Sequence, residues 1–174
     1  SKDEAMELRA SLGNKFKVLV HRDRDSLTDD EVVALKADYE SEGVRLWVTD
    51  QSDLEAEFCD PGFLSSLTGE PINICDVWIT EILAQNQVPI AEQFAAQRAA
   101  HNAELHKAGG SPLNDDVWRA FQGRSLRGAK GKTVFKQLKN KVPGNRFSEA
   151  TALSHDGYPE RATSLKANLE ELLA

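Results

Sequence analysis

The sequence predicts an α/β fold, in which a strand–helix–strand unit is followed by a mostly helical portion. Two short runs of apolar and β-branched residues, 16–21 and 44–49, have the length and composition of buried strands. A helical pattern separates them, so they are expected to pair in parallel with a right-handed crossover. From about residue 74 the apolar residues recur at helical spacing. We therefore expect an α/β segment over residues 1–72 and a helical extension over residues 73–174.

Local signals place the helices of the first segment. Residues 2–12 carry apolar side chains on one side of a helix, and Gly13 follows as a stop signal. Thr28 and Glu31 form a capping box, in which each side chain satisfies a backbone amide of the other residue. This box predicts the start of the crossover helix, which is expected to end at Gly43.

A second capping pattern follows the second predicted strand. Ser52 and Glu55 have the same spacing and predict a short helix that runs to about Phe58. The sequence Asp-Pro-Gly at 60–62 is expected to break it.

The second segment is predicted to be built from helices joined by glycine- and proline-containing connections. A helical pattern starts at Ile74 and is expected to be interrupted at Pro89. Residues 122–131 contain three glycines and are expected to form a mobile or ligand-shaped loop. The further predicted helices cover 90–107, a turn from Asn114 or Asp115 to Phe121, 132–142 and 161–173.

Two aspartates, Asp23 and Asp25, follow the first predicted strand. If extended geometry continues to Asp25, both side chains leave the same face at the carboxyl end of the strand, the edge where open α/β sheets bind ligands. Two carboxylates aimed at one point repel each other unless a cation or a proton lies between them. Because hard oxygen ligands suit Mg²⁺, Mn²⁺ or Ca²⁺, the pair predicts a metal site, with a solubilising turn as the alternative.

The net charge of −7 is unevenly distributed. Between Asp116 and Glu149 there is no acidic residue, whereas nine of the 21 basic residues lie there. A basic segment on an acidic protein predicts phosphate binding over residues 117–148, with a solvated helix face as the alternative. The candidates for contacts with nucleic acid are Arg124, Arg127, Lys130, Lys136 and Lys139.

Several classes of protein are disfavoured by the sequence. No apolar run approaches the ~18 residues of a membrane-spanning helix, and the amino-terminal residues are charged. Cys59 and Cys75 lie far apart without a Cys or His partner nearby in the sequence. We expect reduced core thiols in a cytoplasmic protein, with a disulfide or a zinc site as the alternative.

The order of three motifs resembles a Toprim domain. His21-Arg-Asp23-Arg-Asp25 ends one strand, Ser52-Asp53-Leu-Glu55 follows the next, and Gly131-Lys132 opens a late helix. More narrowly, residues 15–141 are similar to the Toprim-like nuclease domain of the OLD (overcoming lysogenization defect) family of ATPase-linked endonucleases, with relatives in bacterial phage-defence systems. The resemblance implies a partial Toprim-like parallel sheet and metal-dependent cleavage of DNA.

The resemblance also implies roles for individual residues. Asp23 and Asp25 match the aspartates that coordinate Mg²⁺ or Mn²⁺, and Glu55, with Asp53 beside it, matches a further acidic ligand. Lys132 matches a lysine that neutralises charge on the scissile phosphate. Independently, a lysine in the first turn of a helix opposes the helix dipole, so we expect an anionic group near Lys132 to compensate.

One motif of the family has no counterpart in this sequence, the glutamate that ends its first strand. Since a two-stranded parallel sheet also exposes both edges, we expect a strand or two upstream. If the glutamate lies upstream, the chain is the C-terminal part of a larger protein and a poor nuclease in isolation. If the protein never had this glutamate, the expectation is that the chain is no nuclease at all. The expected partners are DNA, an ATPase domain of the same or an associated polypeptide, and a second copy of the chain in a homo-oligomer, without a membrane.

Two alternative functions remain open. The stretch from Asp23 to Thr28 resembles the nucleophile loop of haloacid-dehalogenase-type phosphatases, which implies that Asp23 is attacked by phosphate while Asp25 acts as acid and base. That family needs a later acidic pair, for which only Asp156 and scattered helix glutamates are present. The other alternative is a non-catalytic domain that uses the basic segment to hold nucleic acid or a partner protein.

Overall fold

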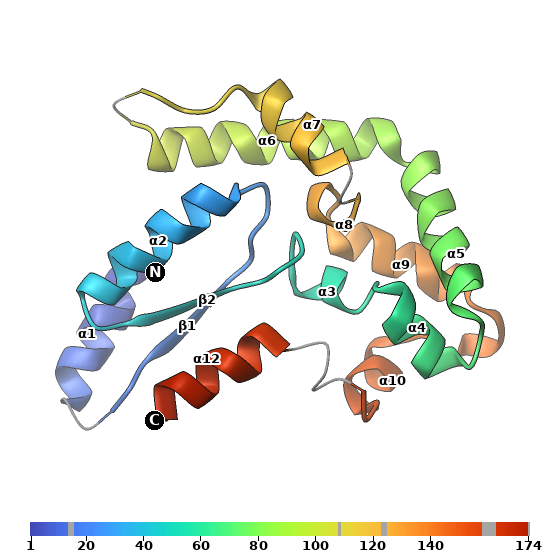
Figure 1. Ribbon diagram of the computed structural model, residues 1–174, viewed down its shortest axis with the longest axis horizontal. Helices are drawn as coiled ribbons and strands as arrows, with labels where there is room; N and C mark the ends of the chain where they lie inside the picture. The colour runs from blue at the N-terminus through green and yellow to red at the C-terminus, as the bar shows by residue number, and fades with distance from the viewer. Residues whose placement is uncertain (14–15, 108, 123–124, 158–162, 174) are drawn as a thin grey trace.

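A computed structural model describes residues 1–13, 16–107, 109–122, 125–157 and 163–173. It has the predicted α/β class, with a small parallel sheet near the amino terminus and helices over most of the remaining chain (Figure 1). In chain order the elements are α1 (Lys2–Leu12), β1 (Leu19–Arg22), α2 (Asp29–Ser41), β2 (Arg45–Val48), α3 (Leu54–Glu57), α4 (Pro61–Thr68), α5 (Ile72–Gln85), α6 (Gln87–Leu105), α7 (Asn114–Gln122), α8 (Ser125–Gly128), α9 (Gly131–Lys141), the 3₁₀ turn η1 (Pro143–Asn145), α10 (Glu149–Ser154) and α12 (Thr163–Leu173).

The predicted strand–helix–strand unit is confirmed. β1 and β2 pair in parallel, with Leu19 opposite Arg45 and Arg22 opposite Val48, and α2 is the crossover between them. The capping box of Thr28 and Glu31 begins α2, as the sequence predicts. Apolar side chains from α1, α2 and β2 fill the core on one face of the sheet; they include Ala5, Val32, Leu35, Tyr39, Leu46 and Val48.

The other face of the sheet is covered by α12 near the carboxyl terminus (Figure 1). Trp47 donates a hydrogen bond from Nε1 to Ser164 Oγ at 3.0 Å, and Arg45 donates from Nε to Asn168 Oδ1 at 3.2 Å. Arg45 and Trp47 alternate along the strand with the residues of the α1–α2 core, so they lie on the opposite face. The sheet is therefore the middle of three layers.

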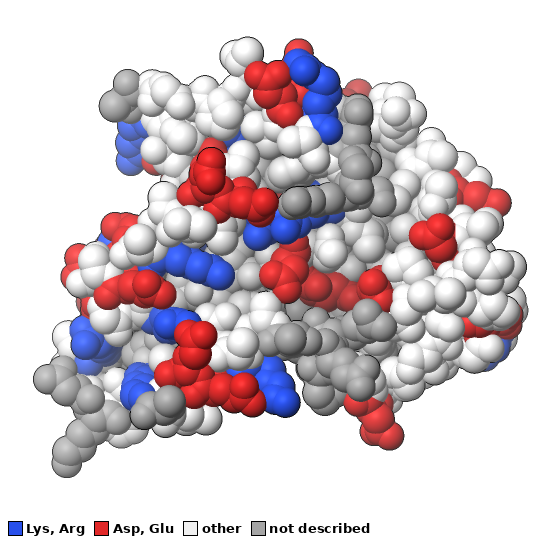
Figure 2. Space-filling model, in the orientation of Figure 1, with Lys and Arg blue, Asp and Glu red and all other residues white. Residues whose placement is uncertain are grey.

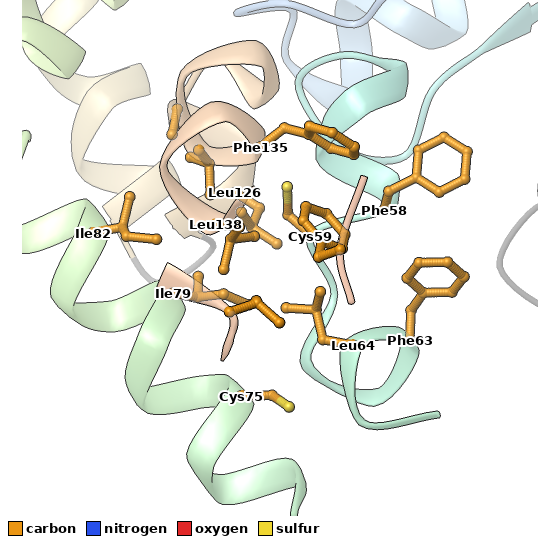
Figure 3. Close-up of a cluster of buried hydrophobic side chains, with 14 of the residues drawn as sticks. Phe58, Cys59, Phe63, Leu64, Cys75, Ile79, Ile82, Leu126, Phe135 and Leu138 are labelled. Carbon is orange, nitrogen blue, oxygen red and sulfur yellow. The ribbon is translucent and has the colours of Figure 1, made fainter. Parts of the chain in front are cut away.

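A second apolar core joins α3 and α4 to the helices that follow them. Phe58, Phe63 and Leu64 pack with Ile79 of α5 and Leu138 of α9 (Figure 3). This core thus combines residues from both sides of the predicted boundary at residue 72, which stays a prediction. Both cysteines, Cys59 and Cys75, are buried free thiols in this core, as expected from the sequence.

Both predicted helix breaks are present, since α3 ends at Glu57 and α5 ends at Gln85, and the proline at each break lies in the first turn of the next helix. Asp60 caps α4 by accepting a hydrogen bond from Phe63 N at 2.8 Å, and Pro61 is the first helical residue, a position that tolerates its missing N–H. Pro89 lies in the first turn of α6 for the same reason. The expected loop over residues 122–131 contains the helix α8, and residues 123–124 lie outside the described chain.

The first strand is shorter at its start than predicted. β1 begins at Leu19, and Phe16, expected inside the strand, is 54% exposed. Pairing with β2 begins only where Val18 O accepts the N–H of Arg45, so the residues before Val18 have no ladder partner on β2. Among the described helices, none is long and apolar enough to cross a membrane.

Candidate functional site

The acidic residues of the candidate site lie beyond the carboxyl ends of β1 and β2. Asp23 follows β1 directly, and its Oδ1 accepts the N–H of Leu54 at 3.3 Å. His21 Nε2 lies 3.4 Å from the same oxygen. The side chain of Asp23 is 43% exposed, so it reaches both solvent and the start of α3.

Asp25 is not on an extended strand. β1 ends at Arg22 and Asp25 has a φ of 51°, so the expectation that Asp23 and Asp25 share one face of a strand is wrong. The N–H of Asp25 donates to Ser52 O at 2.5 Å, which ties this left-handed turn to the exit of β2. Gln97 of α6 donates from Nε2 to Asp25 Oδ1 at 2.7 Å. Aspartate tolerates the left-handed region better than most residues, so the turn itself costs little.

The predicted capping box at Ser52 and Glu55 is also wrong. The N-cap of α3 is Asp53, whose Oδ1 accepts the N–H of Ala56 at 3.0 Å. Ser52 Oγ instead donates to Ala129 O, next to the start of α9. Aspartate and serine are about equally good caps, so tertiary contacts decide between adjacent candidates.

Asp53 joins α3 to the start of α9. Its second oxygen, Oδ2, accepts the N–H of Gly131 at 2.9 Å and so satisfies a free amide at the amino terminus of α9. A Cβ at residue 131 would overlap both Asp53 and Ala56, so only glycine fits this approach. Burial of Asp53, which is 3% exposed, raises its pKa to about 6, and the charges of Glu55 and Asp23 act in the same direction.

Glu55 and Lys132 face each other across the α3–α9 junction. The Lys132 Nζ lies 3.6 Å from Glu55 Oε1, and Lys132 is 68% exposed. The anionic compensation expected for Lys132 is confirmed, since both Glu55 and Asp53 lie at the amino terminus of α9. Because Glu55 makes no capping box, helix capping does not account for its presence at this site.

The carboxylates of this site influence each other's protonation. Burial raises the pKa of Asp25, and the nearby Asp23 carboxylate raises it further, while Lys130 and Arg22 act against the shift. Asp23 also contributes to the raised pKa of Asp53. Figure 2 shows acidic side chains gathered over α3, with basic side chains beside them towards α8. We call Asp23, Asp25, Asp53 and Glu55 the acidic cluster.

The candidate nucleic-acid contacts lie in different environments. Lys130 and Lys136 are exposed, and Lys139 lies 3.8 Å from Glu149. Arg127 is 14% exposed on its side chain and donates to Asp29 Oδ1 at 2.9 Å, so it is engaged with the start of α2. Arg124 lies outside the described residues. The exposed side of α9 borders a depression of about 430 Å³ that is lined by Lys132, Thr133, Lys136, Gln137 and Asn140.

The contribution of α6 to the site was not found from the sequence. The apolar positions Ile90 and Phe94 of this helix are continued at helical spacing by Arg98 and His101, and all four are buried. Polar residues on an otherwise apolar helix face indicate buried polar partners, so this spacing was the available signal. Gln97 is adjacent to that face and reaches Asp25.

The donor atoms of the acidic cluster match a hard divalent cation in chemistry. Carboxylate oxygens are the ligands of Mg²⁺ and Mn²⁺, and each Asp53 oxygen keeps a lone pair beyond its backbone hydrogen bond. Within the described part of the chain, no three His, Cys, Asp or Glu side chains are close enough together to hold one ion. Metal binding therefore requires rotation of the partly exposed Asp23 and Glu55 side chains.

No protein-family model, curated protein or solved structure matches this chain.

Proposed function

We propose that this chain carries the divalent-metal site of a Toprim-like nuclease that cleaves DNA phosphodiester bonds. The observation that carries the proposal is the convergence of three motifs far apart in the sequence. Asp23 accepts the N–H of Leu54, Asp53 accepts the N–H of Gly131, and Glu55 faces Lys132. The chain thus gathers carboxylates and a lysine at one sheet edge, where open α/β folds bind ligands.

The chemistry of these groups fits phosphodiester hydrolysis. Bound Mg²⁺ or Mn²⁺ would supply an activated water and stabilise the leaving oxygen. Asp23, Asp25, Asp53 and Glu55 would supply the carboxylate oxygens that hold the ion. The Lys132 ammonium, exposed at the amino terminus of α9, would offset the extra negative charge on the phosphate.

The basic side chains around the acidic cluster are consistent with a polyanionic substrate. Lys130, Lys132 and Lys136 are exposed at the start of α9 and along it, and Lys132 lies 3.6 Å from Glu55. Basic side chains in a row bind the phosphates of DNA without reading its sequence. In this proposal the chain acts in the cytoplasm, with an ATPase domain of the same or an associated polypeptide controlling cleavage in phage defence.

The test is nicking of supercoiled plasmid by the chain in Mn²⁺ or Mg²⁺. We expect slow nicking that EDTA abolishes and that is lost in Asp23→Ala. The matched control is Asp76→Ala, which removes an exposed aspartate on α5 and should retain nicking. Equal activity in the wild type and Asp23→Ala would refute the proposal, and so would binding of DNA without any cleavage in saturating Mn²⁺.

A phosphatase of the haloacid-dehalogenase type is the second candidate, and the environment of Asp25 favours it. Its raised pKa, caused by burial and by Asp23, suits a group that donates a proton to a leaving alcohol. This candidate predicts Mg²⁺-dependent hydrolysis of a generic phosphomonoester and inhibition by beryllofluoride. Hydrolysis of the phosphomonoester, without nicking of plasmid under the same conditions, would favour the phosphatase over the nuclease.

A further inference from the structure

One face of α6 holds the loop between β1 and α2 that carries Asp25. Figure 1 shows this loop rising from the end of β1 to the side of α6. Four residues of α6 form hydrogen bonds with the loop and the residues that border it: Gln97, Arg98, His101 and Glu104. Gln97 and Arg98 are adjacent, and each later residue follows about one helical turn further on, so all four lie on one side of the helix.

Arg98 forms the fixed part of this contact. It is fully buried and donates to Ser26 O at 3.1 Å and to both carboxylate oxygens of Glu31, at 2.7 and 3.0 Å. His106 Nε2 lies 2.7 Å from Glu31 Oε1. A buried guanidinium with two parallel contacts to one carboxylate has a fixed orientation, so Arg98 ties α6 to the start of α2.

Two further contacts hold the ends of the loop. The Ser26 hydroxyl is 2.9 Å from His101 Nδ1, and both residues are buried. Arg22, the last residue of β1, donates to both oxygens of Glu104 at 2.9 and 3.0 Å. The loop is therefore fixed to α6 on either side of Asp25.

Gln97 makes the contact that reaches the acidic cluster. Its Nε2 donates to Asp25 Oδ1 at 2.7 Å, while the backbone N–H of Asp25 donates to Ser52 O. A neutral amide donor orients a carboxylate without neutralising its charge, so the carboxylate keeps its attraction for a cation. The Asp23 carboxylate nearby repels that of Asp25, and the hydrogen bond from Gln97 holds Asp25 in place against this repulsion.

We propose that Gln97 is a positioning residue that holds the Asp25 carboxylate for metal binding, and that α6 thereby sets the geometry of the site. The metal role of Gln97 rests on the function proposed above. Its role in holding the Asp25 turn does not, because that role is a property of the metal-free protein.

The experiment compares Gln97→Met, which keeps side-chain length without the donor, with Gln93→Met on an exposed position of the same helix. The first measurement is amide hydrogen exchange in metal-free protein. Loss of a hydrogen bond to a charged group should speed exchange of the Asp25 amide by about tenfold or more in Gln97→Met. Exchange equal to that of Gln93→Met would overturn the positioning role.

The second measurement is Mn²⁺ affinity, followed by the loss of the electron paramagnetic resonance signal of free Mn²⁺. Removal of a group that orients a metal ligand weakens binding by about 10- to 100-fold, and we expect this for Gln97→Met with an unchanged unfolding midpoint. Unchanged or tighter binding would contradict the metal role of Gln97. If the wild type binds no Mn²⁺ while the Asp25 amide still exchanges faster in Gln97→Met, the function proposed above fails and the positioning of the turn stands.

Discussion

The buried contact between Arg98 and Glu31 and the acidic cluster differ in how their charges are balanced. Glu31 has two hydrogen bonds from Arg98, one from the backbone of Thr28 and a contact with His106. Burial alone would raise its pKa, but these partners outweigh burial and lower the pKa to about 2.

In the acidic cluster the balance is reversed. Asp53 is buried like Glu31, yet its hydrogen bonds come from neutral amides, and its pKa rises to about 6. A guanidinium partner therefore outweighs the effect of burial on the pKa of Glu31, whereas the neutral amide donors at Asp53 do not. The following predictions test this difference, beginning with the largest effect.

Replacement of Arg98 by methionine is expected to cost the most stability. It leaves the Glu31 carboxylate buried without its guanidinium partner, at a cost of about 3–5 kcal/mol in the free energy of unfolding. The double variant Arg98→Met/Glu31→Leu should recover most of this loss, because no unpaired charge remains. Denaturant unfolding of the single and the double variant measures both free energies. If the free energy of unfolding of Arg98→Met lies within about 1 kcal/mol of the wild-type value, the change is no larger than for an ordinary surface substitution, and the pair does not stabilise the fold.

Acid should destabilise the protein through Glu31. Its folded pKa is depressed from 4.5 to about 2, so its contribution is fully present above pH 4.5 and is lost as the pH falls towards 2. The shift corresponds to about 3 kcal/mol. Between pH 4.5 and pH 2 the free energy of unfolding should depend less on pH in Glu31→Gln than in the wild type. An equal pH dependence in the two proteins would contradict the assignment of this effect to Glu31.

The pH dependence of Asp53 should have the opposite sign. Its folded pKa is raised from 3.8 to about 6, so the folded state binds the proton more tightly, and stability rises as the pH falls from 7 towards 4. The contribution is about 3 kcal/mol at most and should be absent in Asp53→Asn. Unfolding curves at pH 4 and pH 7 provide the measurement. Saturating Mn²⁺ should remove the same dependence in the wild type if the ion binds beside Asp53.

The smallest effect on stability is expected for Lys132. The side chain is exposed and its pair with Glu55 is partly solvated, so Lys132→Ala should change the free energy of unfolding by less than about 0.5 kcal/mol. Plasmid nicking should nevertheless fall by about 100-fold, the effect of removing a group that stabilises the transition state. Lys136→Ala, one turn further along α9, is the matched control and should lose much less. Equal losses would assign both lysines to DNA binding alone.

The local signals in the sequence predicted the sheet and its crossover well. The capping box of Thr28 and Glu31 and the β-branched runs agree with the structure because each depends on neighbours within a few residues. The same reasoning failed at Ser52, where a contact with Ala129, far along the chain, decides which residue caps α3. Local patterns cannot reveal contacts of this range.

The candidate site was predicted in part. Placement of Asp53 and Glu55 beside Lys132 followed from the order of the motifs, but the turn at Asp25 did not, because it depends on hydrogen bonds to Ser52 and Gln97. Gln97 and Arg98 stand in an alanine-rich helix, and the spacing of Arg98 after Ile90 and Phe94 indicates burial without naming a partner. Their partners come from a loop about 70 residues earlier, and only the tertiary fold brings them together.

The most direct test of the account is a crystal of this protein soaked in Mn²⁺ and examined by anomalous scattering. The account predicts a peak bonded to Asp23 at about 2.0–2.6 Å, together with at least one oxygen of Asp25, Asp53 or Glu55. Lys132 should then lie free of Glu55. A crystal saturated with Mn²⁺ that shows no peak at the acidic cluster, with Glu55 still paired to Lys132, would contradict it.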